Sequence, residues 1–211
     1  MFATAGLLLA ALGLQQQAAP VRATLPEPGT RAAAVRAAPP PVIDGRDDDL
    51  VWQRAQPITE FRVFDPEEGR APRYETVAKV AFDDRNLYVF VRAFDAEPNT
   101  IQRQLVRRDD YPPTDHVVVM VDSYHDHRSG FEFGVNPSGA KFDASVSEDG
   151  NEDGAWDGVW DVVARIDSIG WTAEFRIPLS QLRFADAPSH TFGLGIVRDI
   201  ARLKERLSWP Q

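Results

Sequence analysis

The sequence predicts an all-β protein, an antiparallel β-sandwich of the jelly-roll or immunoglobulin-like type with at most one or two short helices. Three observations predict this fold class. Short apolar or alternating runs recur along the chain, turn residues separate them at close spacing, and no long amphipathic helical pattern interrupts them. The stretch from residue 115 to residue 142 shows this pattern most clearly. We expect the rest of the domain to be arranged around it.

The central stretch predicts three consecutive antiparallel strands. Residues 117–121 are an unbroken apolar run rich in β-branched residues, as in a strand covered on both faces. Residues 131–135 alternate large apolar side chains with Glu and Gly, which is typical of a strand with one buried face. Residues 136–139, Asn-Pro-Ser-Gly, supply a turn, so that residues 140–146 can return as the third strand.

The N-terminal residues predict export. Residues 5–14 are apolar, too short to span a bilayer, which takes about 20 residues, but long enough for the core of a signal peptide. Val21 and Ala23 place small residues at −3 and −1 of a cleavage site that ends a signal peptide of residues 1–23. The alternative is a disordered Ala-rich tail. Residues 24–40, rich in Pro and Ala, predict a disordered linker. We therefore expect a periplasmic, outer-membrane or extracellular protein.

The folded domain is expected over residues 41–211. Residues 41–45 predict a first short strand, and an acid in residues 47–49 can cap a single helical turn that places Trp52 inward. Further strands are expected at residues 61–64, 76–82 and 87–94, the last two forming a hairpin. Residues 101–110 are the one segment expected to form a short helix, with its arginines facing solvent or a ligand.

The second half of the domain continues the pattern of short strands. Residues 147–158 are acidic and Gly-rich, which predicts a loop. Strands are expected at residues 159–167, 171–177 and 192–197, and residues 207–209 begin another. Pro178 ends the second of these, since proline cannot donate to the ladder. Because the chain stops at Gln211 as a strand begins, we expect a covalent continuation into a C-terminal domain.

Composition, charge and missing motifs exclude several classes of partner and enzyme. The formal net charge of −9 and a pI near 4.9 argue against nucleic acid or an anionic membrane as partner. The chain has no Cys, so its stability must come from the core rather than from disulfides. It also has no G-x-S-x-G nucleophile motif and no phosphate-cradling glycine loop. We expect no catalytic activity in this domain.

Four segments occur in an order that resembles a known family. They are residues 42–45 with Trp52, residues 78–84 with residues 86–89, residues 115–122, and residues 171–178. Together they resemble the family 9 carbohydrate-binding modules, and more closely the version at the N-terminus of large exported bacterial proteins that continue into an outer-membrane β-barrel. The resemblance implies a β-sandwich, non-catalytic binding of oligo- or polysaccharide and, in some members, structural calcium.

Two positions depart from what the resemblance implies for the binding site. Sugar-binding members hold the ring hydroxyls with a glutamate on the central strand and an arginine on the next, and the matching positions here are Val118 and Gly134. Tyr111 is the nearest counterpart of the stacking tryptophan, and a second stacking aromatic would fall beyond Trp209. A second hypothesis is therefore a sandwich that has lost its sugar pocket and serves as the protein-interaction domain of an outer-membrane barrel protein.

Sugar recognition needs an aromatic face for the apolar side of the ring and planar polar groups for its hydroxyls. The candidate aromatic residues are Tyr111, Trp156 and Trp160, and the candidate polar residues are Asp115, Asn136, Asp157, Arg107 and Arg108. All lie in or beside predicted loops. The alternative for each tryptophan is packing, which we favour for Trp52 and Trp171 because each sits in an apolar pattern.

Two groups of residues have metal-ligand character. Residues 149–154, Asp-Gly-Asn-Glu-Asp-Gly, match the first half of a calcium loop, which gives Asp149, Asn151, Asp153 and Asp157 as candidate ligands. Trp160 stands where the loop's final Glu belongs, and a solvated acidic loop is the alternative. His125 and His127, with Asp122 and Asp126, allow a transition-metal site if that loop is extended, and a solvated turn otherwise.

A haem-binding sandwich is a third hypothesis. Such domains use Met and His as axial ligands, and Met120 lies near His116 in the central strand. Core packing is the alternative for Met120.

Overall fold

The computed structural model describes residues 31–110, 112–148, 150–184 and 189–211. Its strands are β1 (Val35–Arg36), β2 (Arg62–Asp65), β3 (Thr76–Phe82), β4 (Asn86–Phe94), β5 (His116–Asp122), β6 (Gly130–Val135), β7 (Lys141–Ser147), β8 (Asn151–Asp153), β9 (Asp161–Asp167), β10 (Gly170–Pro178), β11 (Gly193–Ile200) and β12 (Glu205–Trp209). Its helical elements are α1 (Leu50–Arg54) and the 3-10 turns η1 (Pro98–Thr100), η2 (Leu179–Gln181) and η3 (Ala201–Leu203). No helix within these ranges has the length and apolar character that a membrane span requires.

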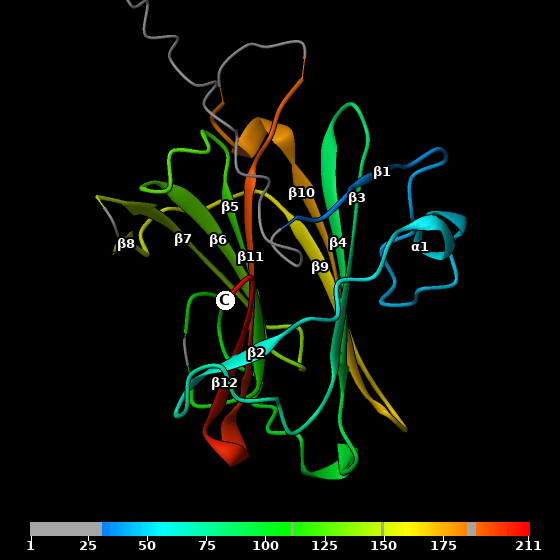
Figure 1. The fold of residues 1–211 in the computed structure, drawn as a ribbon, viewed down its shortest axis with the longest axis vertical. Coiled ribbons are helices and arrows are strands. Elements are labelled where there is room, and N and C mark those ends of the chain that lie inside the picture. The colour runs from blue at the N-terminus through cyan, green and yellow to red at the C-terminus, as the bar shows by residue number, and fades with distance from the viewer. Residues whose placement is uncertain (1–30, 111, 149, 185–188) are drawn as a thin grey trace, which may run out of the picture.

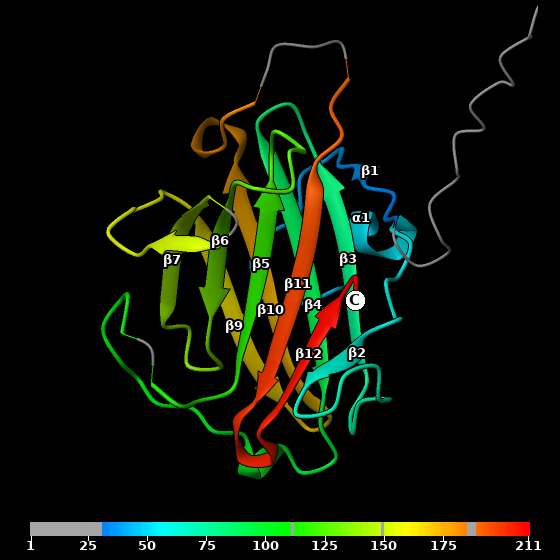
Figure 2. The ribbon, with the colours of Figure 1, turned by 60° about the vertical axis from the view of Figure 1, so that its left-hand side comes forward.

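The strands form two sheets that face each other, which confirms the predicted β-sandwich (Figure 1). One sheet has five strands in the order β1-β3-β4-β10-β9, and the other has seven in the order β2-β12-β11-β5-β6-β7-β8. In Figure 2 the seven-stranded sheet lies in front of the other. The named strand pairs are antiparallel except for β1, which runs parallel to β3.

β5 is the central strand of the seven-stranded sheet, between β11 and β6. Its alternation places Val117, Val119 and Val121 in the interior, where each is at most 1% exposed. The other face of the strand is covered as well, since Val118 is only 6% exposed. This confirms the prediction that the apolar run forms a strand with both faces covered.

The N-terminal part of the domain differs from the prediction. Residues 41–45 form no strand, and β1 lies instead within the expected linker, paired with Ala81 and Phe82 of β3. Prolines 39, 40 and 41 explain this, because a proline has no N–H to donate to a ladder. The chain then passes over the outer face of the five-stranded sheet, where the predicted helical turn forms as α1 and buries Trp52 completely.

Glu174 of β10 anchors this N-terminal cover. Its carboxylate is fully buried and accepts hydrogen bonds from Trp52 Nε1 at 2.8 Å and from the amides of Asp44 and Gly45 at 2.9 and 2.8 Å. Burial raises the pKa of Glu174, although these three donors act in the opposite sense. The hydrogen bonds of Glu174 therefore hold the N-terminal segment against the outer face of the five-stranded sheet, beside the apolar cluster that contains Trp52.

The segment from residue 101 to residue 110 is also different from the prediction, because it forms no helix. It runs as an irregular strip along the seven-stranded sheet. The amide of Asp115 donates to the Gln102 carbonyl at 3.1 Å, and the amide of Asp109 donates to the Lys141 carbonyl at 3.2 Å. These tertiary hydrogen bonds replace those that a helix would have made within the segment. The predicted loop at residues 147–158 likewise contains a short strand, β8, which pairs with β7.

Arg198 of β11 connects the two sheets from inside the sandwich. Its side chain is completely buried, and Nη1 donates to the carbonyl of Glu75 and the hydroxyl of Thr76, both at 3.0 Å. Nη2 donates to the carbonyl of Phe94 on β4 at 2.8 Å. Burial lowers the pKa of Arg198 to about 10, so the guanidinium still carries its charge at neutral pH, where the Asp115 carboxylate attracts it.

We expect Arg198→Met to lower the free energy of unfolding by about 3 kcal/mol, because methionine fills the space but removes the three hydrogen bonds that the guanidinium donates between the sheets. Urea denaturation measures this loss. The control is Arg176→Met, which removes an exposed pair with Asp161 and should cost less than about 1 kcal/mol. Equal losses for the two variants would show that Arg198 does not hold the sheets together.

Candidate functional site

Those of the predicted binding residues that the structure describes gather at one end and edge of the seven-stranded sheet. They lie on the irregular strip of residues 101–115 and on two segments that this strip contacts, the β6–β7 turn and the segment between β8 and β9 (Figure 2). Tyr111 and Asp149 lie outside the described residues. Arg107 is exposed, on the same strip as Arg108.

A buried carboxylate on β7, Asp143, joins the strip to the β8–β9 segment. Its Oδ2 accepts hydrogen bonds from Trp160 Nε1 at 2.7 Å and from Arg108 at 2.5 Å, and its Oδ1 accepts one from the amide of Gly158 at 3.1 Å. Sequence reasoning missed this residue. One feature of the sequence could have indicated it. Asp143 lies within a predicted strand, and a carboxylate that is buried there needs hydrogen-bond partners.

The structure brings two predicted sugar ligands together as an ion pair. Arg108 pairs with Asp157 as well as with Asp143, and it donates to the Gly158 carbonyl at 2.9 Å. Its side chain remains 33% exposed, while that of Asp157 is 71% exposed. Asp143 therefore holds the guanidinium in place, and the exposed edge of the pair faces solvent.

The two candidate tryptophans have different positions. Trp160 is 1% exposed, stacks against Phe175 with the ring centroids 5.9 Å apart, and gives its N–H to Asp143. Its ring is buried and its polar atom is already bonded inside the protein, so the prediction that Trp160 stacks on a sugar is wrong. Trp156 packs on Phe131 at 4.9 Å but stays partly exposed at the surface.

Asp115 and Asn136 are buried and hold the loops around them. The Asn136 side chain donates to the Gln104 carbonyl at 2.8 Å and accepts the amide of Ala140 at 3.0 Å, which closes the β6–β7 turn. Asp115 accepts the amide of Ala201 at 3.1 Å. Burial raises the pKa of Asp115, and that hydrogen bond acts in the opposite sense. Both residues therefore position the site, where the sequence predicted direct ligands.

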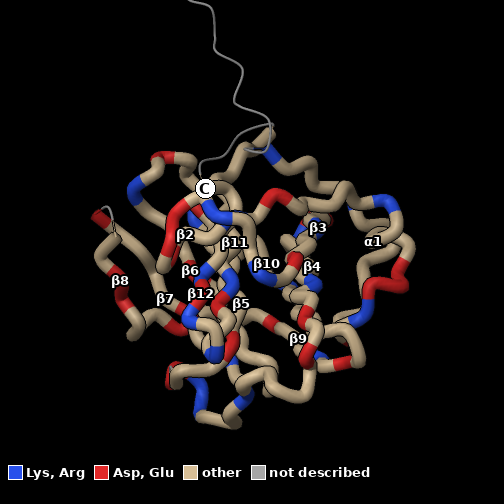
Figure 3. The backbone as a smooth tube through the Cα atoms, turned by 60° about the horizontal axis from the view of Figure 1, so that its bottom comes forward, with Lys and Arg blue, Asp and Glu red and all other residues tan. Residues whose placement is uncertain are grey.

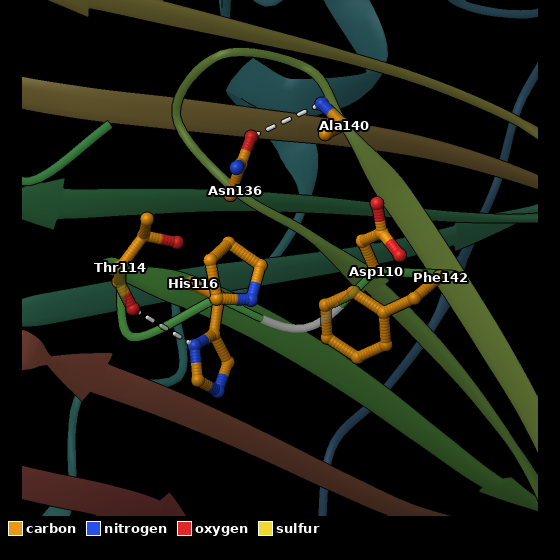
Figure 4. Close-up of a pocket in the computed structure, with 7 residues that line it drawn as sticks. Asp110, Thr114, His116, Asn136, Ala140 and Phe142 are labelled. Atoms are coloured by element: carbon orange, nitrogen blue, oxygen red, sulfur yellow. Dashed lines mark hydrogen bonds between the residues drawn. The ribbon is translucent and has the colours of Figure 1, made fainter. Parts of the chain in front are cut away.

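A shallow pocket opens where the strip meets the ends of β5, β6 and β7 (Figure 4). It encloses only about 10 Å³ and is lined by Asp110, Pro112, Thr114, His116, Asn136, Ala140 and Phe142. In Figure 4 the ring of Phe142 lies beside Asp110, Thr114 and His116 lie on the other side, and the hydrogen bond between Asn136 and Ala140 lies above them. The pocket thus combines an aromatic ring with an exposed carboxylate at its rim.

Phe142 reaches this position because its neighbour on β6 is glycine. A Cβ at Gly134 would collide with the Phe142 ring, so only glycine lets the ring lie against the sheet. Val118, on the adjacent strand, pairs with Gly134 and is itself nearly covered. Neither Val118 nor Gly134 offers a polar side-chain atom here, and the floor of the site is apolar.

A row of polar residues crosses the outer face of the same sheet from β5 to β12. His116 Nε2 lies 2.9 Å from the carboxylate of Asp199, which also accepts a hydrogen bond from Arg206 Nε at 3.0 Å. Burial alone would raise the pKa of Asp199, but these two partners hold it below its usual value. His116 Nδ1 contacts the Thr114 carbonyl at 3.1 Å, so both ring nitrogens are engaged and neither is presented to a haem iron.

The calcium candidates that the structure describes lie in different surroundings. Asn151 and Asp153 lie in β8, where Figure 3 shows acidic residues on the chain's surface edge, and Asp157 pairs with Arg108. Among the described residues, one group of three or more potential ligands has its ligand atoms close together, and it contains Asp122, His125 and His127. None of the described calcium candidates belongs to it.

Comparison with known proteins agrees with this architecture. The sequence model of the family described as "Carbohydrate family 9 binding domain-like" matches residues 43–205. One similar solved structure is a family 9 carbohydrate binding module from Caldicellulosiruptor kristjanssonii in complex with glucose, with 18% identity, a TM-score of 0.59, and coverage of 85% of this chain and 84% of that chain. Another, from the same organism, contains cellotriose, with 17% identity, a TM-score of 0.56, and coverage of 85% and 83%. None of the curated proteins matches the chain.

We expect Gly134→Ala to lower the free energy of unfolding by about 1–3 kcal/mol, because the added methyl group must displace the Phe142 ring. In the background Phe142→Ala the same change should cost less than half as much, since the obstructing ring is gone. A double-mutant cycle by urea denaturation measures both values. Additive losses would show that the ring does not lie over the glycine.

Proposed function

Because the chain belongs to the carbohydrate family 9 binding domain-like family, we propose that its sandwich binds oligo- or polysaccharide without catalysing a reaction. The match over residues 43–205 is the observation that carries this proposal. The two similar structures, which hold glucose and cellotriose, support a glucose-containing ligand. The described site adds an aromatic ring, an exposed carboxylate and a partly exposed guanidinium, which are the groups that recognise a sugar ring and its hydroxyls.

We place the saccharide over the pocket at the ends of β5, β6 and β7. The face of Phe142 provides the apolar contact, and Asp110 at the rim accepts hydrogen bonds from hydroxyls. Arg107 and Arg108 lie next to Asp110 along the strip, where the amide of Asp110 donates to the Arg107 carbonyl at 3.2 Å. A chain of several sugar units can extend from the pocket along this strip towards Asp157 and Trp156.

The shape of the pocket predicts weak binding. Its cavity of about 10 Å³ has room for little more than one water molecule and is far smaller than the roughly 300–1,000 Å³ of sites that enclose a ligand. A sugar on such a surface keeps much of its hydration and forms few contacts. We therefore expect dissociation constants between about 1 μM and 1 mM, which correspond to about −8 to −4 kcal/mol.

A protein-interaction domain is the second candidate function. It is favoured by Val118 and Gly134, which leave the floor of the site without a polar side chain. On that hypothesis the sandwich keeps its fold and its outer sheet face contacts another protein or another part of a larger chain.

Calorimetric titration with glucose and cellotriose tests saccharide binding. We expect cellotriose to bind the unchanged protein, and Phe142→Ala or Asp110→Ala to weaken it at least about tenfold, a loss of about 1.4 kcal/mol. The control is Ile169→Ala, an exposed apolar residue on the turn between β9 and β10 of the other sheet, which should bind as tightly as the unchanged protein. A folded protein that binds neither these sugars nor any member of a glycan array is not a carbohydrate-binding module.

We also propose that the domain is exported, as the head of a larger protein. The support is the apolar run at residues 5–14 followed by the small residues Val21 and Ala23. Mass spectrometry of protein from bacterial cells should find Thr24 as the first residue of the mature chain. Leu8→Arg places a charge in the apolar run and should leave the chain unprocessed, whereas an unprocessed original sequence would contradict export by this route.

A further inference from the structure

The loop between β5 and β6 brings three metal-ligating side chains together. The ligand atoms of Asp122, His125 and His127 all lie within 4.8 Å of one another. The two imidazole rings have their centroids 4.7 Å apart, with planes inclined by 54°. We propose that this cluster binds a divalent transition-metal ion of the zinc class.

The loop holds its shape through hydrogen bonds that leave the ligands available. Asp122 accepts the amides of Asp126 and His127, one on each carboxylate oxygen, at 3.2 and 2.8 Å. Each oxygen has two lone pairs, so one on each remains for a metal ion. The Asp126 carboxylate accepts the amides of Arg128 and Ser129 at 2.8 Å and so fixes the rest of the turn.

The backbone at both histidines has the left-handed conformation that residues other than glycine seldom adopt. The φ angles are 54° at His125 and 59° at His127. Alternation along the sequence required an extended loop to bring the two imidazole rings to the same side. In the structure the rings instead meet because the chain turns at both histidines. This conformation is unfavourable for a residue with a side chain, and a bound metal ion would offset its cost by bonding to both imidazoles.

The donor set selects the class of ion. Two imidazole nitrogens and one carboxylate are typical ligands of Zn²⁺ and of neighbouring ions such as Ni²⁺ and Cu²⁺, whereas Ca²⁺ and Mg²⁺ take oxygen ligands. Zn–N bonds of about 2.0–2.1 Å require ligand atoms about 3.3 Å apart, so the cluster must contract by no more than about 1.5 Å. Both imidazoles are exposed and can rotate to do this. Three protein ligands leave a fourth position for water or an outside ligand.

This site is separate from the proposed sugar site. The cluster lies at the Asp122 end of β5, and the pocket includes His116 at the other end. The seven residues of the strand place these ends about 20 Å apart. Metal binding therefore does not rest on the proposed function, and either can fail without the other.

Calorimetric titration of the protein without a polyhistidine tag tests the proposal, with ZnCl₂ as the ligand. We expect one Zn²⁺ to bind per chain, and CaCl₂ at the same concentrations to give no comparable binding. His125→Asn and His127→Asn should each weaken Zn²⁺ binding at least tenfold. Asparagine tolerates the left-handed conformation, so these variants remove the imidazole while keeping the turn.

The matched control is His190→Asn, which removes another exposed imidazole, near Phe184 and Phe192. This variant should bind Zn²⁺ as tightly as the unchanged protein. Circular dichroism confirms that each variant is folded, and Co²⁺ gives a second readout through visible absorption bands that disappear in His127→Asn. Absence of Zn²⁺ binding, equal binding by all three variants, or equally tight Ca²⁺ binding would overturn the proposal.

Discussion

The rest of the described structure depends on the apolar contact between the inner faces of the two sheets. Side chains such as Val119 of β5 and Phe175 of β10 are completely buried in it, and each strand must keep its register to remain so. The chain has no cysteine, so no disulfide supports this contact. Arg198 supports it instead, because its guanidinium donates from one sheet to carbonyl groups of the other. The ends of the strands, and therefore the loops, are fixed by these two interactions.

The outer faces of the two sheets have different roles. The segment that contains α1 covers the five-stranded sheet, and Glu174 takes hydrogen bonds from that segment in place of a ligand. The seven-stranded sheet carries the polar row that includes His116, Asp199 and Arg206, together with the pocket beside Phe142. Recognition is consequently expected on the seven-stranded sheet and its loops, because the other face is already occupied by the protein itself.

The strands could be predicted because alternation reports burial directly. The strand expected over residues 76–82 coincides with β3, and the helical turn that buries Trp52 was also expected. The failures have another cause. Trp160, at the start of a predicted strand beside a loop, looks available to a ligand until its N–H is seen to bond Asp143, which is distant in the sequence. The strip of residues 101–110 has helical composition but finds its hydrogen-bond partners on β7 and near β5. Such partners are distant in the sequence and are brought close only by the complete fold, so a local sequence pattern cannot identify them.

The same reasoning indicates where specificity resides. Phe142 covers Gly134, and Val118 beside it is apolar, so a sugar at this surface meets a ring and not a hydrogen-bonding strand. Asn136 is fully engaged in holding its turn, and Asp143 holds Arg108 from below. The exposed polar residues beside the pocket, Arg107 and Asp110, lie on the strip that follows Ile101. These exposed positions can change without disturbing the core, whereas Ile101 and Asp115 are buried, and we infer that the exposed positions set which saccharide is recognised.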